Sequence, residues 1–193
     1  SEGCGQGFNP SGSLVKAVLM NGAQSLKGIQ SLPNGPIVGE VSDYDNNQNF
    51  GTVNLIKSLA IYGKNDINFV VVNNRILQAG RKNEIIVKAK KSFCDETELS
   101  VTISWYDDKG SYGCTNCLVN DLDLYVQRVR DSKIMWPNGL KNRDDTNNSE
   151  RVRFEIEDGQ KYRIVVEATN LSSQSQSYSM AAMGCFEIDE ISD

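Results

Sequence analysis

The sequence predicts a mainly β protein: a jelly roll or β-sandwich of about seven or eight antiparallel strands with a short helical N-terminal appendage. Apolar and polar residues alternate with period two through the second half of the chain, and turn-forming clusters separate the alternating runs. Helical spacing of apolar residues is confined to the beginning of the chain. We therefore divide the chain into residues 1–63 and residues 64–193.

Each alternating run fits a strand that turns one face to a core and the other to solvent. Turn signals at residues 107–110, 137–139 and 158–159 separate the runs. The predicted strands cover residues 68–72, 84–89, 99–105, 122–126, 152–156, 162–168 and 178–182.

The first part of the chain predicts two helices and a long loop. A helix over residues 13–23 begins with a serine cap, at Ser11 or Ser13, and carries an apolar stripe of Leu14, Val15, Val18 and Leu19. A shorter helix is predicted for residues 53–60, and residues 28–50, rich in Gly, Pro, Asn and Asp, predict the loop between them. Two short helices cannot bury a core alone, so they must dock on another body.

Composition excludes several functions. The net charge of −5 disfavours nucleic-acid binding, which needs basic surface. No apolar run approaches the roughly 18 residues of a membrane span. The chain has no histidine, so it cannot assemble a Ser-His-Asp or Cys-His site, and we assign it no catalytic residue.

Five cysteines indicate an oxidising compartment and disulfide bonds. Cys94 and Cys185 are candidates for one bond across sheet edges, and Cys114 and Cys117 for a small local loop. A zinc site or a thioredoxin-type redox site at this C-x-x-C remains open, although no second C-x-x-C or helix supports either. Cys4 is left over, which suggests a bonding partner outside the chain.

Two N-x-S/T sequons, at Asn147 and Asn170, are candidate glycosylation sites in polar stretches. They are compatible with a secreted or secretory-pathway protein.

Two aspartates predict a cation site. Asp121 and Asp123 alternate on one strand and so face the same side, where they repel each other unless a cation or proton joins them. Calcium is the expected ion, with Asn120 or a carbonyl of residues 107–117 as a further ligand. The alternative is hydrogen bonding to turn amides or arginines. Asp144, Asp145 and Glu150 are weaker ligand candidates, in what otherwise reads as a solvated loop.

Three stretches resemble subtilisin-like serine proteases. Residues 10–23 (PSGSLVKAVLMNGA) resemble the helix after the nucleophile helix of the catalytic domain, and residues 48–55 (QNFGTVNL) resemble the segment that closes that domain. The third match is a series: residues 118–126 (LVNDLDLYV), 137–139 (PNG) and 147–152 (NNSERV). This order resembles the jelly-roll domain that follows the catalytic domain in kexin-like and certain alkaline subtilases.

The resemblance implies that residues 1–63 end a catalytic domain and residues 64–193 form the jelly roll after it. The G-T-S-x-A nucleophile motif is absent and is expected upstream, with the rest of the triad. The implied role is a C-terminal segment of a secreted endopeptidase that stabilises or completes the catalytic domain, its partner, while that domain acts on protein or peptide substrates. The alternative is a stand-alone jelly-roll module that binds glycans or proteins.

Overall fold

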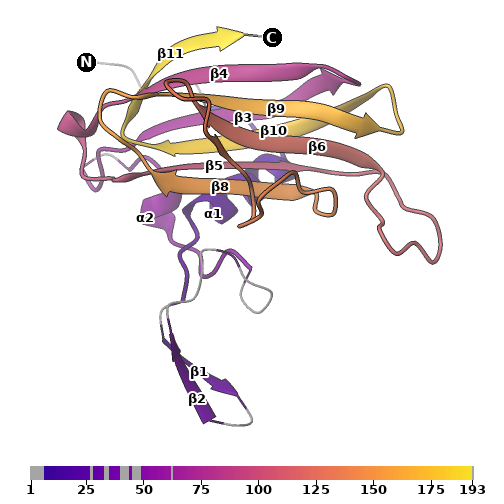
Figure 1. Cartoon of the computed structure of the whole chain (residues 1–193), viewed down its shortest axis with the longest axis horizontal. Helices are drawn as coiled ribbons and strands as arrows, with labels where there is room; N and C mark the ends of the chain where they lie inside the picture. Colours follow the sequence, from indigo (N-terminus) through magenta and orange to yellow (C-terminus); the bar gives the residue numbers. More distant parts are fainter. Residues whose placement is uncertain are drawn as a thin grey trace.

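The computed structural model describes residues 7–26, 28–32, 35–39, 44, 49–61 and 63–192. These residues form a two-layer β-sandwich with two short helices against its outer face, and a two-stranded sheet that extends away from the body (Figure 1). Cys4 lies outside the described residues. Among the described helices, none is long and apolar enough to cross a membrane.

The sandwich has a four-stranded and a five-stranded sheet, and all its strand pairs are antiparallel. The first sheet has the order β3 (Asn68–Gln78), β10 (Ser175–Gly184), β5 (Glu98–Trp105), β8 (Ser149–Glu155). The second has the order β11 (Phe186–Ser192), β4 (Lys82–Ala89), β9 (Lys161–Leu171), β6 (Asn120–Arg128), β7 (Ile134–Met135).

The strand order confirms the predicted fold class. Counted from β3, one sheet runs first, eighth, third, sixth and the other second, seventh, fourth, fifth, which is the order of a jelly roll. The short β7 completes this order, and β11 adds a ninth strand beside β4. A 3-10 turn, η1 (Lys91–Phe93), follows β4.

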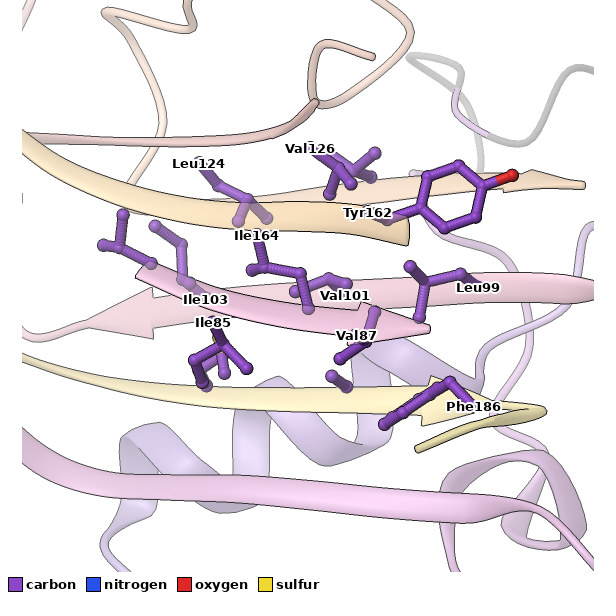
Figure 2. Packing of buried hydrophobic residues seen from close by; sticks show 14 of the residues in the cluster. Ile85, Val87, Leu99, Val101, Ile103, Leu124, Val126, Tyr162, Ile164 and Phe186 are labelled. Carbon is purple, nitrogen blue, oxygen red and sulfur yellow. The ribbon is translucent and has the colours of Figure 1, made fainter. Parts of the chain in front are cut away.

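The core lies between the two sheets and follows from the period-two pattern. Alternate residues of β4, β5, β6 and β9 point inward and interdigitate, and Phe186 of β11 joins them (Figure 2). Leu99, Val101 and Ile103 of β5 are fully buried. Burying such a side chain contributes roughly 1.5–3 kcal/mol, so this cluster is the main source of stability.

The other face of β5 is buried as well, because helix α1 (Gly12–Gly22) covers it. Leu14 and Ala17 pack against the sheet, and the buried Asn21 Oδ1 accepts hydrogen bonds from the hydroxyls of Ser100 (3.0 Å) and Thr102 (2.9 Å). The serine and threonine side chains that alternate along β5 therefore face a helix and not solvent.

Two arginines of β8 fix the C-terminal end of α1. Arg151 donates to the carbonyls of Met20 and Ala23, both at 3.0 Å, and Arg153 donates to those of Asn21 and Ala23. These carbonyls carry the negative end of the helix dipole, so guanidinium groups suit them. The helix is thereby attached to the sandwich by charge-assisted hydrogen bonds as well as by packing.

The first part of the chain differs from the prediction in three ways. Residues 28–50 were expected to be a loop, but β1 (Gly28–Leu32) and β2 (Gly35–Gly39) form an antiparallel pair there. The sequence did not predict this pair, because its residues include glycine and proline and do not alternate between apolar and polar. The pair is held by backbone hydrogen bonds. Helix α2 (Leu55–Ser58) is shorter than predicted.

The third difference concerns the apolar stripe of α1. The buried face of the helix is Leu14, Ala17 and Asn21, and it packs on the jelly roll itself, whereas Val15 is 44% exposed. The predicted apolar stripe therefore has two environments. Leu14 packs on the jelly roll, and Val15 faces outward.

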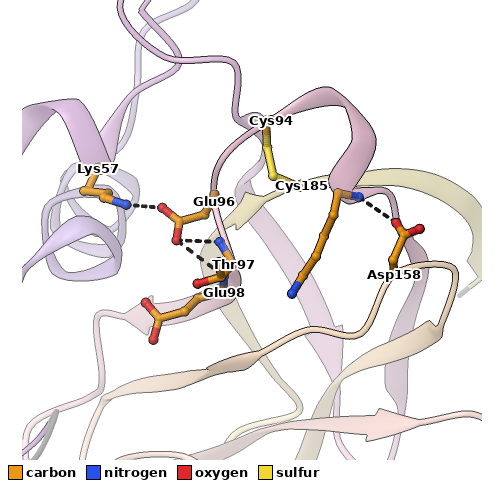
Figure 3. The surroundings of a disulfide bond; sticks show 8 residues. Lys57, Cys94, Glu96, Thr97, Glu98, Asp158 and Cys185 are labelled. Atoms are coloured by element: carbon orange, nitrogen blue, oxygen red, sulfur yellow. Dashed lines mark hydrogen bonds and ion pairs between the residues drawn. A yellow bond between two sulfur atoms is a disulfide. The ribbon is translucent and has the colours of Figure 1, made fainter.

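A disulfide joins Cys94 to Cys185, with Cα atoms 5.7 Å apart (Figure 3). It links the β4–β5 connection to the β10–β11 connection, and both connections pass from one sheet to the other. Beside it, Lys57 of α2 forms an ion pair with the buried carboxylate of Glu96. The same end of the sandwich is therefore held covalently and also tied to α2.

Candidate metal centre

Three carboxylates from two sheets meet at one edge of the sandwich. Asp121 and Asp123 lie on β6, and Glu150 lies on β8 of the other sheet. One oxygen of each lies within 4.8 Å of the others. This group, Asp121, Asp123 and Glu150, is called the carboxylate cluster below.

An open strand edge makes room for Glu150. Strand β7 pairs with β6 only at Val126 and Gln127, so no described strand pairs with this edge of β6 before Val126. The Glu150 side chain reaches across from β8, and its Oε2 accepts a hydrogen bond from the Leu124 amide at 2.6 Å. The carboxylate thus satisfies a backbone amide that the sheet leaves unpaired.

Each member of the cluster keeps one buried oxygen without a hydrogen-bond partner in the described structure: Asp121 Oδ1, Asp123 Oδ1 and Glu150 Oε1. Asp123 is 1% exposed and Glu150 is 0% exposed. The other oxygen of Asp123 accepts from the Thr169 hydroxyl and lies 3.6 Å from the Arg143 guanidinium. Buried anionic oxygens without partners are costly, so this group of carboxylates favours a cation as a ligand.

The electrostatics of the cluster point the same way. Burial, and then the neighbouring Asp123 and other carboxylates, raise the pKa of Asp121 to about 7. Burial also raises the pKa of Asp123, and it raises the pKa of Glu150 well above its ordinary value. Without a cation, the folded cluster therefore binds protons that the unfolded chain releases.

The donor set fits a hard cation. Carboxylate oxygens from three residues suit ions such as calcium, and the cluster contains no nitrogen or sulfur donor of the kind that zinc prefers. The carboxylate cluster can therefore hold a metal ion. Such an ion would join β6 to β8 and so cross-link the two sheets.

The other predicted ligands lie elsewhere. The Asn120 side chain points between the sheets, where it donates to Gln176 and accepts from Ser173, so it is not part of the cluster. Asp144 is buried in its own turn and accepts from the amides of Thr146 and Asn147 and from the Asn138 side chain. Asp145 is exposed.

Glu150 is among the weaker ligand candidates in the sequence, and it is fully buried in the structure. It was assigned to a solvated loop, but β8 begins at Ser149 and Glu150 is a core-facing strand residue. The alternation of Val152 and Phe154, continued back by one step, places Glu150 on the core face. A buried glutamate needs a partner, so its core-facing position in the sequence pattern could have identified Glu150 as a ligand.

The two sequons differ in their surroundings. The Asn147 side-chain amide donates to both oxygens of Asp144, at 3.0 and 2.8 Å, and the residue is half-buried. Asn170 is exposed near the end of β9, opposite Asp121. Glycosylation of either remains a prediction, and Asn170 is the more accessible.

Cys114 and Cys117 are joined by a disulfide in the connection between β5 and β6. The connection is exposed around Cys117, and Asp107 closes its base by accepting from the amides of Val119 (2.7 Å) and Asn120 (2.8 Å).

The raised pKa values predict a pH dependence in the absence of metal. An acid whose folded pKa exceeds its unfolded value stabilises the fold when protonated, so this contribution is lost as pH rises from about 4 towards about 7. In EDTA, the melting temperature of the chain should fall between pH 5 and pH 7.5. The pKa of Asp131 is lowered to about 2, so this residue changes the stability of the fold only at pH values below this range. A melting temperature that rises over this range, measured by scanning fluorimetry, would contradict the assignment.

The chain is similar to a curated protein and, more distantly, to solved structures. The chain is 26% identical over 189 residues to the Serine protease/ABC transporter B family protein tagA of Dictyostelium discoideum. The match covers 90% of this chain but only 10% of that protein, so the chain spans about a tenth of its relative's length. No family model matches the chain. The Yersinia pseudotuberculosis-derived mitogen aligns with 61% of the chain and 85% of its own, at 18% identity and a TM-score of 0.35.

Proposed function

We propose that this chain is the C-terminal segment of a secreted subtilisin-like serine endopeptidase, in which it stabilises or completes the catalytic domain. The matched stretches at residues 10–23, 48–55 and 118–126 support this, and the 26% identical relative is named as a serine protease/ABC transporter protein. The triad is supplied by the catalytic domain. We assign no catalytic residue to this chain, and its histidine-free sequence is compatible with that division of roles.

The observation that carries the proposal is the two-sided environment of the N-terminal region. One side of α1 is fixed to the jelly roll through Leu14, Asn21 and Arg153, as described above. Elsewhere in the N-terminal region, large apolar side chains are exposed. We call this set the N-terminal apolar face: Val15, Leu26, Val53, Leu55, Ile56 and Leu59.

An independent module would bury such residues. Helix α2 is four residues long, yet Leu55 and Ile56 are both more than half exposed. Val15 of α1 and Leu55 and Ile56 of α2 are exposed on helices that contact each other, and exposed apolar side chains of this kind favour an interaction surface. The occupant we propose is the α/β body of the catalytic domain, because residues 10–23 and 48–55 resemble segments that pack within such a domain.

The carboxylate cluster supplies the second part of the role. We propose that it binds calcium and that the ion is structural. It would hold β6 and β8 together and relieve the repulsion among Asp121, Asp123 and Glu150. The disulfides fit an oxidising, extracellular setting, where free calcium is plentiful enough for a weak site to fill.

A pair of substitutions tests the docking role. Leu55→Asp with Ile56→Asp should change the stability of the isolated chain by no more than about 0.5 kcal/mol, because both side chains are exposed. In the full-length protein, the same pair should lower labelling by a fluorophosphonate serine-hydrolase probe at least about tenfold, since two carboxylates would be buried unpaired at the interface.

Leu140→Asp is the matched control, because Leu140 is similarly exposed but lies in the connection between β7 and β8. It should leave labelling unchanged. Equal labelling of all three proteins would show that the N-terminal apolar face is not a catalytic-domain interface. A full-length protein that the probe never labels would refute the protease assignment itself.

A further inference from the structure

The Cys114–Cys117 disulfide is placed where it can act on the carboxylate cluster. It closes a loop within the β5–β6 connection, and this connection leads into β6, which carries two residues of the cluster. Asp121 follows the connection directly, four residues after Cys117. The sequence predicts that this disulfide closes a small local loop, and the proposed protease role does not explain its function.

The first link runs forward along the chain. The Asp107 carboxylate binds the amides of Val119 and Asn120, so the start of β6 is set by a residue at the opposite end of the connection. The position of Asp121 therefore depends on the conformation of the backbone between Asp107 and Val119. The disulfide restricts that conformation.

The second link crosses to the loop before β8. Asn116 lies inside the disulfide loop, and its side-chain amide donates to the Asp145 carbonyl at 2.8 Å. The loop that contains Asp145 leads to Glu150. The disulfide loop therefore contacts the approaches to both strands of the cluster, β6 through the chain and β8 through Asn116.

The disulfide loop is tightly packed against Gly110. A Cβ at that position would lie 3.2 Å from Cys114 Sγ and 3.2 Å from Cys117 Cβ. Two thiols need more room than a disulfide, because their sulfur atoms separate from bonding distance to van der Waals contact. Reduction would therefore push the loop away from Gly110 and release its present path.

The two disulfides differ in accessibility. Cys117 is exposed and Cys114 is half-buried, whereas in the other disulfide Cys185 is buried and Cys94 is half-buried. Thiol–disulfide exchange requires access of the attacking thiolate to a sulfur atom. An external dithiol therefore reaches the Cys114–Cys117 bond first.

We propose that the Cys114–Cys117 disulfide is a redox control on cation binding by the carboxylate cluster, an inference that rests on the proposed metal site. An external dithiol gives two electrons and two protons to the bond, which becomes two thiols while the dithiol becomes a cyclic disulfide. The loop then loosens, Asp121 and Glu150 lose their alignment, and the cation is held less tightly. By linkage, a bound cation makes the disulfide harder to reduce by the same factor.

Calcium titration by calorimetry in the two redox states tests this. A Cys4→Ser chain leaves only the four cysteines of the two disulfides. Dithiothreitol is applied until Cys114 and Cys117 alone are reduced, as judged by alkylation and peptide mass. The affinity for calcium should fall about five- to tenfold on reduction. The Cys114→Ser/Cys117→Ser chain should bind as weakly as the reduced protein.

The Asn116→Ala variant distinguishes the proposed redox control from a general loss of structure on reduction. It keeps the disulfide but removes the contact with Asp145, so it should weaken calcium binding in the oxidised state, whereas the exposed Asn142→Ala should not. Equal affinities in the oxidised and reduced states overturn the redox control and leave the metal site standing. Absence of calcium binding in both states overturns the metal site and the control with it.

Discussion

Saturating calcium raises the melting temperature of the wild-type chain at neutral pH, and Glu150→Gln abolishes the increase: this is the result we expect from the carboxylate cluster. At a calcium concentration about a hundred times the dissociation constant, linkage gives about 2.7 kcal/mol. For a chain of this size that corresponds to a shift of about 5–10 °C.

The Glu150→Gln variant tests the effect of the Glu150 charge with little change in side-chain shape. It has nearly the same shape and keeps an oxygen for the Leu124 amide, but it removes one of the three buried anions. Its metal-free form should be at least as stable as the wild type at neutral pH, because the folded wild type must either bury the Glu150 charge or take up a proton, and glutamine needs neither. Glu155→Gln, at the exposed end of the same strand, is the control and should keep the full calcium response. A Glu150→Gln chain that responds to calcium like the wild type would show that the ion binds elsewhere.

Loss of the Cys94–Cys185 disulfide should have a still larger effect on folding. The bond spans 91 residues and joins two connections that each pass between the sheets. Removing it by Cys94→Ala with Cys185→Ala should lower the free energy of unfolding by about 2–5 kcal/mol, because the unfolded chain regains the entropy of a long loop. The midpoint of urea unfolding measures this.

The second disulfide provides the comparison. Cys114 and Cys117 are three residues apart, so their removal frees a much shorter loop and should lower the unfolding free energy by no more than about 1–2 kcal/mol. The two pairs therefore divide their roles: the long-range bond affects stability most, and the local bond affects the metal site. Equal losses of stability for the two double variants would contradict this division.

Much of the fold could be predicted because the jelly roll obeys simple periodicity. The alternation of Leu99, Val101 and Ile103 with small hydroxyl residues located β5 to within a residue. The same alternation could not reveal that α1 covers the hydroxyl face, because serine and threonine are equally suited to solvent and to Asn21. The pair β1–β2 escaped detection since glycine-rich strands lack an apolar period.

The sequence predicted only part of the carboxylate cluster. Asp121 and Asp123 share a strand, so their proximity followed from local geometry. Glu150 comes from the opposite sheet, and only the tertiary fold brings it within 4.8 Å of them. Asn120 failed as a ligand because neighbouring strand residues point to opposite faces, and its side chain belongs to the interior between the sheets.

The most direct test of the protease assignment is the sequence encoded immediately upstream of Ser1. A G-T-S-x-A motif at the start of a helix should occur within a few dozen residues, with the histidine and aspartate of the triad further upstream. That result would make the N-terminal apolar face a contact within a serine protease. A signal peptide or an unrelated domain directly upstream would contradict the assignment, and the jelly roll would then be a binding module with its own cation site.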